Sequence, residues 1–360
     1  MSTKAMTMTQ STSAIESGKL LITGATGFLG QHVVAAARAA GYDVSALVRD
    51  VEAPAARMLL EAKAEGELEL YAGDVLDPAS VEQAAEGCVA VLHCAGKVSR
   101  AGEDATEMTR VNVGGVEVVL DACKAAGLRR AVVASTSGTI GISTDPERVA
   151  DERDEPPLSL INKWPYYRSK YYGEQSALAR DAEDFEVVVV NPALLLGPGD
   201  LHGSSTEDVR RALEQRSPVV PAGGYAFVDA RDAAEGMILA LQKGRAGQRY
   251  LLVSCNCPIR TFVTRVARVA GLDGPVFALP DHAVVERATR WFARQAQSLL
   301  GEDDAMPDET SIEMAQHYWY VDSTRAENEL GWRARDPMIT LADTVADLRE
   351  RGIVMMRAPA

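Results

Sequence analysis

The stretch Thr23-Gly24-Ala25-Thr26-Gly27-Phe28-Leu29-Gly30 follows an apolar run and opens a segment with helical periodicity. A pyrophosphate binds backbone N–H groups at a helix N-terminus, where a side chain would collide with it and the helix dipole favours an anion. Gly24 permits the tight turn, Gly27 the close approach of the phosphates, and Gly30 the packing of helix on strand. Because a strand precedes the glycines and a helix follows them, the stretch predicts a dinucleotide phosphate site.

Strands and helices alternate around this stretch, as is typical of a parallel sheet with crossover helices. The expected strands are Lys19–Thr23, Asp43–Val48, Leu68–Ala72, Ala90–His93, Arg130–Ser135 and Glu186–Asn191. The expected helices include Gln31–Ala40, Val111–Ala126, Tyr167–Arg180, Glu207–Gln215 and Ala230–Gln242. After Pro192 the pattern becomes irregular, with breaks at Gly and Pro. The sequence therefore predicts an α/β fold: a Rossmann-type doubly wound parallel sheet with a smaller, discontinuous C-terminal substrate domain.

The expected domain boundaries follow from these changes of pattern. Residues 1–17 are rich in Ser, Thr and Met without an apolar run, which predicts a disordered tail. Residues 18–193 form the expected dinucleotide-binding domain, to which residues 226–253 return. Residues 194–225 and 254–345 form the expected substrate-binding region. Within that region, Ala283–Leu300 has an amphipathic pattern that predicts a core or dimer helix, with a lid over an apolar substrate as the alternative.

Composition excludes several classes of function. A formal net charge of −14 disfavours binding to nucleic acid or to an anionic membrane, because phosphate surfaces repel it. No stretch approaches the roughly 20 apolar residues of a membrane-spanning helix. The cysteines are scattered without a Cys-x-x-Cys pair or clustered histidines, which predicts a reducing, cytoplasmic setting and no metal site.

The segment Pro165-Tyr166-Tyr167-Arg168-Ser169-Lys170 contains Tyr-x-x-x-Lys. On a helix, residues four apart share one face, so the phenol and the ammonium can reach one cofactor. A carbonyl that accepts a hydride must also receive a proton, but free tyrosine has a pKa of about 10. We expect the lysine cation to lower the pKa of Tyr166, which makes Tyr166 and Lys170 the candidate catalytic pair.

Two motifs carry a resemblance to a known family. With Ser169 before the lysine and Glu174 after it, the tyrosine segment resembles the YxxSKxxxE pattern of extended short-chain dehydrogenases/reductases. The glycine stretch, TGATGFLG, resembles the same family's Gly-x-x-Gly-x-x-Gly motif. The resemblance extends from about Lys19 to Trp332 and is strongest in the first two-thirds. It implies a nicotinamide-dependent oxidoreductase of the epimerase/dehydratase superfamily, similar to its dihydroflavonol-reductase and hydroxysteroid-dehydrogenase-like branch.

The resemblance also implies roles for single residues. Thr136, five residues before Gly141, matches the hydroxyl that bonds the substrate oxygen beside the tyrosine, with Ser135 and Ser137 as alternatives. Asn112 matches a helix asparagine that helps to hold an active-site water and the lysine; a polar residue bonded to local backbone is the alternative. The implied cofactor contacts, besides the glycines, Tyr166 and Lys170, are Thr26, Phe28, Leu29, Asp74, Val75, Ala95, Gly96, Pro192, Ala193 and Leu194.

The second strand ends where such folds distinguish NAD from NADP. Members of the family that use NAD usually carry a carboxylate there, which bonds the ribose 2′-hydroxyl. This chain has Val48 at that position, followed by Arg49. An arginine fits a 2′-phosphate, because its planar guanidinium binds phosphate in a bidentate manner. The sequence therefore favours NADP(H), with NAD(H) as the alternative because Asp50 lies one residue later.

Three functions follow in order. The first is reversible hydride transfer between NADPH and a carbonyl of a mainly apolar small molecule. The second is a nucleotide-sugar epimerase or dehydratase with tightly bound NAD, although Asn191 stands where those members often carry arginine. The third is an NADP-binding sensor without catalysis. The family resemblance also implies a homodimer.

Overall fold

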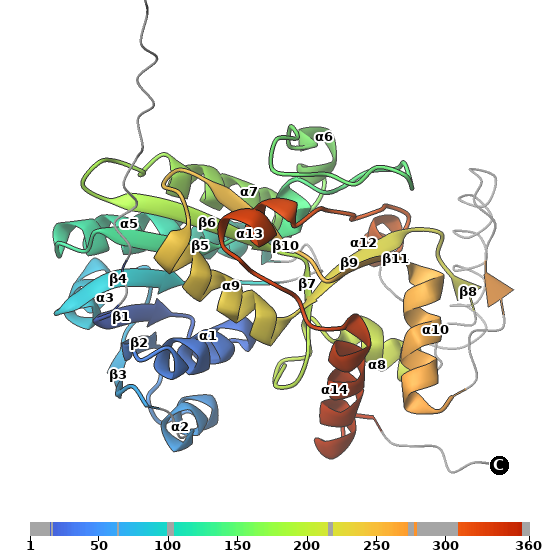
Figure 1. Cartoon of the computed structure of the whole chain (residues 1–360), viewed down its shortest axis with the longest axis horizontal. Coiled ribbons are helices and arrows are strands. Elements are labelled where there is room, and N and C mark those ends of the chain that lie inside the picture. Colours follow the sequence, from blue (N-terminus) through green and yellow to red (C-terminus); the bar gives the residue numbers. More distant parts are fainter. Residues whose placement is uncertain are drawn as a thin grey trace, which may run out of the picture.

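The computed structural model describes residue 15 and residues 17–62, 65–98, 104–214, 219–272, 277–278 and 309–354. Its main sheet has seven strands, all paired in parallel, in the order β10-β6-β5-β4-β1-β2-β3 (Figure 1). They are β1 (Lys19–Thr23), β2 (Asp43–Val48), β3 (Leu68–Ala72), β4 (Cys88–His93), β5 (Arg130–Ala134), β6 (Glu186–Pro192) and β10 (Arg249–Leu252). The strand order reverses between β1 and β4, and in doubly wound sheets ligands bind at the carboxyl ends of the strands at that point.

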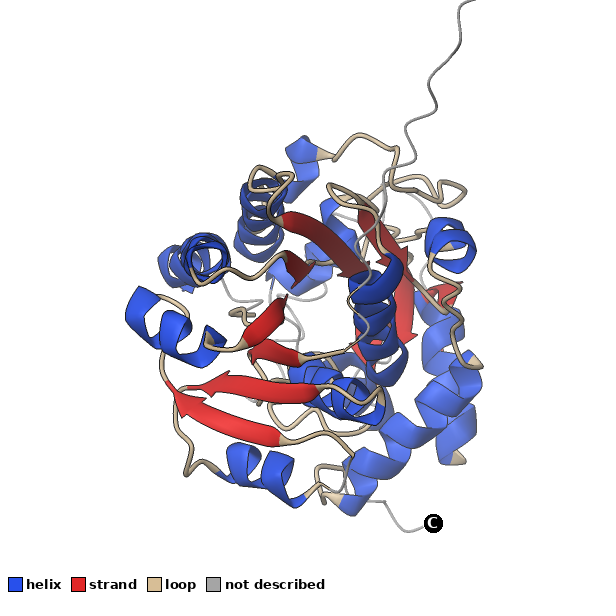
Figure 2. Cartoon of the chain, turned by 60° about the vertical axis from the view of Figure 1, so that its left-hand side comes forward, coloured by secondary structure: helices blue, strands red, loops and turns tan. Residues whose placement is uncertain are grey.

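Helices cover both faces of this sheet, which explains why its strands are apolar throughout (Figure 2). Helices α1 (Phe28–Ala39) and α9 (Ala230–Lys243) pack on one face. Helices α3 (Pro78–Ala85), α5 (Gly115–Ala125) and α7 (Pro165–Leu178) pack on the other. Side chains alternate between the two cores: along β4, Leu92 joins the first and Val91 the second.

A smaller sheet lies beside the main one. Its order is β11-β9-β7, with β11 (Cys255–Pro258), β9 (Gly224–Asp229) and β7 (Leu194–Leu196). It shares a core with α8 (Glu207–Leu213), α10 (Ile259–Ala270) and α14 (Pro337–Glu350). The remaining described elements are α2 (Pro54–Glu61), α4 (Ala105–Thr109), η2 (Arg110–Gly114), η3 (Ser137–Thr139), α6 (Leu158–Ile161), β8 (Val219–Val220), β12 (Phe277–Ala278), α12 (Glu309–Met314) and α13 (Thr324–Glu329).

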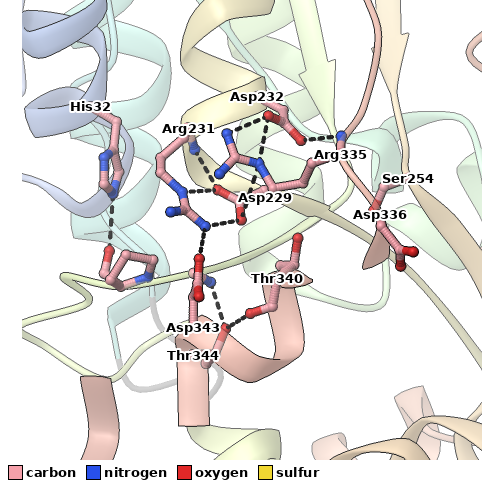
Figure 3. A network of polar contacts seen from close by, with 12 residues as sticks. His32, Asp229, Arg231, Asp232, Ser254, Arg335, Asp336, Thr340, Asp343 and Thr344 are labelled. Atoms are coloured by element: carbon pink, nitrogen blue, oxygen red, sulfur yellow. Dashed lines mark hydrogen bonds and ion pairs between the residues drawn. The ribbon is translucent and has the colours of Figure 1, made fainter. Parts of the chain in front are cut away.

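An ion-pair network fastens the C-terminal segment to the start of α9 (Figure 3). Asp229 caps α9 by accepting from the Arg231 backbone N–H at 2.9 Å. The Arg231 guanidinium bridges Asp229 at 2.7 Å and Asp343 of α14 at 2.6 Å. Arg335 pairs with Asp232 at 2.7 Å. These contacts hold α14 and the segment before it against the small sheet and α9.

The predicted fold class is confirmed, and all six predicted strands are present. The fourth begins earlier than expected, at Cys88. The helix expected over Val111–Ala126 starts as the π-helical turn η2 and becomes α-helical at Gly115. The amphipathic segment Ala283–Leu300 lies outside the described residues. The domain boundaries stay a prediction: β10 completes the main sheet, whereas β9 belongs to the small one.

Candidate active site

The glycine stretch forms a tight turn whose shape depends on having no side chains. Gly24 has a φ of 70°, and a Cβ there would lie 2.5 Å from the backbone N of Ala95. A Cβ on Gly30 would lie 2.0 Å from the carbonyl O of Gly24. The Gly27 N–H closes the turn by donating to Gly24 O at 2.9 Å. The turn leads directly into α1, which has no acidic residue in its first turn. This arrangement fits a dinucleotide pyrophosphate.

The other residues of the predicted phosphate site lie around this turn. Thr26, Phe28 and Leu29 are half-buried. The Phe28 ring packs edge-on against His32, at 5.8 Å between centroids. His32 Nε2 lies 3.0 Å from the carbonyl O of Pro198, so the start of α1 is attached to the turn after β7. The site therefore joins the main sheet to the smaller one.

Helix α7 carries the candidate catalytic pair, Tyr166 and Lys170, one turn apart. The helix begins at Pro165, whose missing N–H is not needed at a first helical position. Lys170 Nζ donates to the carbonyl O of Ala134, at the end of β5, at 2.7 Å. The same Nζ would be 3.9 Å from a Cβ on Gly96. The lysine thus lies between the carboxyl ends of β4 and β5.

The expected effect of Lys170 on Tyr166 is not found, and this prediction is corrected. Burial raises the pKa of Tyr166 to about 12, because a phenolate loses hydration there. Burial also lowers the pKa of Lys170 to about 8, against the opposing charge of Glu174. The ammonium hydrogen bond goes to Ala134 O rather than to the phenol. Desolvation of both groups therefore outweighs their mutual attraction in this structure.

Among the three candidate hydroxyls, Thr136 is the one placed to meet a substrate. Ser135 Oγ donates to Glu174 Oε2 at 2.6 Å and is buried. Ser137 is also buried, at the start of η3. Thr136 is partly exposed, and its Oγ1 accepts from the Gly138 N–H at 3.4 Å, which leaves the hydroxyl proton available.

Asn112 lies in η2 and links two chain segments. Its Nδ2 donates to the carbonyl O of Lys97 and to Ser169 Oγ, both at 2.9 Å. Its Oδ1 accepts from the Lys97 N–H at 2.7 Å. Neither partner is local, so the asparagine connects the segment after β4 to the helix of the catalytic pair. The predicted water is not tested here, but the position beside Lys170 agrees with the expected place of this residue.

The residues predicted to select and orient the cofactor follow the strand ends. Arg49 is exposed directly after β2 and forms no ion pair with another described residue, while Val48 is buried. Asp74 is exposed after β3 and accepts from the Leu76 N–H at 2.9 Å, and half-buried Val75 follows it. Ala95 and Gly96 follow β4, and Pro192, Ala193 and Leu194 connect β6 to β7.

A cluster of aromatic rings beside the catalytic pair was missed by the sequence analysis. The rings of Tyr166 and Tyr167 lie 5.0 Å apart, and Tyr167 lies 4.8 Å from Trp319. Trp164 lies 5.6 Å from Trp319 and 5.2 Å from His317. The signal was the run His317-Tyr318-Trp319-Tyr320, in a chain with only 6% aromatic residues. Pairing with Ser143 and Gly224 brings this run to the site.

The described part of the chain holds no group of three His, Cys, Asp or Glu side chains suited to a metal ion. Over the same residues, every helix is too short or too polar to cross a bilayer. Small-molecule chemistry with an organic cofactor is therefore the reading that the described side chains support.

Comparison with known proteins gives a consistent result. Residues 20–253 match the NAD dependent epimerase/dehydratase family. The chain is 30% identical to a putative dihydroflavonol 4-reductase of Synechocystis, over 92% of this chain and 95% of the relative. It is 30% identical to sterol demethylase protein B of Methylococcus capsulatus, over 93% of this chain and 99% of the relative.

Among solved structures, that of gox2253 has a TM-score of 0.77 at 26% identity, covering 92% of this chain and 98% of the other. The two long sequence matches, the family match and the strand order agree with one another. The chain belongs to the NAD dependent epimerase/dehydratase family, as an extended short-chain oxidoreductase similar to dihydroflavonol 4-reductases.

Proposed function

We propose that the protein reduces a carbonyl group of a mainly apolar small molecule with NADPH, and catalyses the reverse oxidation. The observation that carries the proposal is the grouping of Tyr166, Lys170 and Thr136 at the strand ends beside the glycine turn. NADPH, when bound, supplies the hydride. The glycine turn and α1 hold its phosphates, and Lys170 holds its ribose.

In the proposed reaction, Tyr166 supplies the proton. Negative charge develops on the carbonyl oxygen as the hydride arrives, and a hydrogen-bond donor fixed in place stabilises that charge. Tyr166 is a neutral phenol at physiological pH because burial holds its pKa at about 12, so its proton is present. Thr136 Oγ donates a second hydrogen bond to the same oxygen. The products are an alcohol and the phenolate, which regains its proton from water.

Arg49 and the aromatic cluster support the choice of cofactor and substrate class. An exposed guanidinium without an ion pair to a described residue is suited to a 2′-phosphate, and no carboxylate replaces it at Val48. The rings of Tyr167, Trp164 and Trp319 give the catalytic side of α7 an apolar surface. The names of the two relatives concern a dihydroflavonol and a sterol, both polycyclic molecules, which agrees with such a surface.

The test compares Tyr166→Phe with Tyr172→Phe, an exposed tyrosine on the same helix. Wild-type protein should consume NADPH with some member of a panel of aryl and polycyclic ketones. Loss of the proton donor should lower kcat by about 10²- to 10⁴-fold while the Kd for NADPH stays nearly unchanged. Tyr172→Phe should retain wild-type turnover. Full activity of Tyr166→Phe would refute the assignment, and interconversion of a substrate without net NADPH consumption would indicate an epimerase instead.

A further inference from the structure

Behind the catalytic residues, one buried carboxylate joins the two segments that form the site. Glu174 lies one helical turn beyond Lys170 on α7, and its side chain is fully buried. Glu174 Oε2 accepts hydrogen bonds from Ser135 Oγ at 2.6 Å and from Asn191 Nδ2 at 2.7 Å, and lies 3.0 Å from Thr139 Oγ1. Its other oxygen, Oε1, pairs with Arg249 of β10 at 3.0 Å.

These bonds hold the hydroxyl loop at both ends of η3. Ser135 comes directly before Thr136, and Thr139 ends η3. Asn191 also donates to the carbonyl O of Thr136 at 3.1 Å. The candidate hydroxyl on Thr136 is therefore fixed relative to Tyr166 through one carboxylate, because that carboxylate is on the same helix as the tyrosine.

We propose that Glu174 is a positioning residue, which holds the Thr136 loop against the Tyr166–Lys170 helix and keeps Lys170 charged, with Arg249 as its counter-ion. Part of this inference, the effect on turnover, rests on the proposed carbonyl reduction. The contacts of Glu174 and its charge do not. A buried carboxylate with three donors and an arginine is ionised, since hydrogen bonds and an opposite charge both favour the anion.

The charge of Glu174 acts on Lys170 against burial. Burial lowers the pKa of Lys170, and the Glu174 carboxylate opposes this effect. The other titratable groups that face Lys170 are neutral near pH 7. Burial raises the pKa of Cys94 to about 12, burial lowers the pKa of His93 to about 3, and Tyr166 is protonated. Glu174 is thus the described carboxylate that keeps the ammonium protonated.

The sign of the effect follows. Lys170 is charged below its pKa of about 8 and loses its charge above it. Glu174→Gln removes the negative charge at nearly the same volume, so the pKa of Lys170 falls further. NADPH binding through a charged Lys170 should then weaken at a lower pH than in the wild type. A residue that only filled space would leave this pH dependence unchanged.

The experiment measures the Kd for NADPH from pH 6 to 10 by fluorescence titration, so it needs no substrate. Glu174→Gln should move the alkaline loss of affinity to lower pH, and should also destabilise the fold because it leaves Arg249 buried without a partner. Glu174→Gln with Arg249→Met removes both charges. It should recover much of the thermal stability while the shift in pH dependence remains.

The matched control is Glu152→Gln, since Glu152 is also buried and accepts from the Leu251 N–H at 2.9 Å, away from the site. It should lower stability without moving the pH dependence. Where turnover is measurable, Glu174→Gln should lower kcat by about ten- to a hundredfold with little change in KM, as loss of alignment does.

The proposal is overturned if Glu174→Gln shows the wild-type pH dependence, or if the double variant returns to it. Should the single variant not fold, the double variant decides the question alone. Failure of carbonyl reduction in wild-type protein would count against the proposed function but would leave the binding result, and hence the charge effect on Lys170, fully interpretable.

Discussion

Replacing Arg49 by glutamine tests whether the exposed guanidinium after β2 selects the phosphorylated cofactor. A hydrogen bond to a charged group contributes about 1.5–3 kcal/mol. Arg49 is exposed, so solvent screens the interaction and the lower half of that range applies. Because about 1.4 kcal/mol corresponds to a factor of ten, the Kd for NADPH should rise by about 10- to 30-fold. The Kd for NADH should not change, since NADH has no 2′-phosphate.

The assay is fluorescence titration of both cofactors at fixed ionic strength, because exposed charge pairs weaken as salt increases. Arg57→Gln is the matched control: Arg57 is an exposed arginine on the following helix, α2, paired with Glu52 at 2.6 Å. It should leave both affinities unchanged. Equal weakening of NADPH and NADH by Arg49→Gln, or no weakening of NADPH, would refute the assignment of Arg49.

Two further predictions concern the glycine turn and Lys170. Gly30→Ala should lower the free energy of unfolding by about 1–3 kcal/mol and reduce NADPH affinity, because its Cβ would lie 2.0 Å from Gly24 O. Gly114→Ala, whose Cβ would meet only an ordinary contact at 3.7 Å, is the control, and equal thermal midpoints would contradict the prediction. Wild-type NADPH affinity should decline above about pH 8 as Lys170 loses its proton. Lys170→Arg should abolish that decline, since arginine stays charged; an unchanged profile would assign it to another group.

Local patterns predicted most of the main sheet and the glycine turn. Strands covered on both faces are continuous apolar runs, so β1, β2 and β3 could be placed with the bounds that the structure gives. Gly24 and Gly30 could be interpreted for a similar reason. Their surroundings depend on the adjoining strand and helix, which are close in sequence.

Features that depend on distant segments could not be predicted in this way. Glu174 was recognised only as part of a motif, because its partner Arg249 lies on a strand 75 residues further along. The aromatic cluster depends on pairing of Tyr318 with Ser143 and Gly224, which no local pattern indicates. The pKa of Tyr166 was predicted in the wrong direction, because the sequence shows the nearby lysine but not the degree of burial.

The aromatic wall of the site reaches its place only when the end of the chain does. Trp319 comes after the whole main sheet in synthesis order, and the Arg231–Asp343 ion pair secures the helix that follows it. A nascent or proteolytically shortened chain could thus already recognise the dinucleotide while still unable to retain an oily ligand. For protein engineering, the same division means that the last fifty residues are where specificity can be exchanged with little risk to nucleotide recognition.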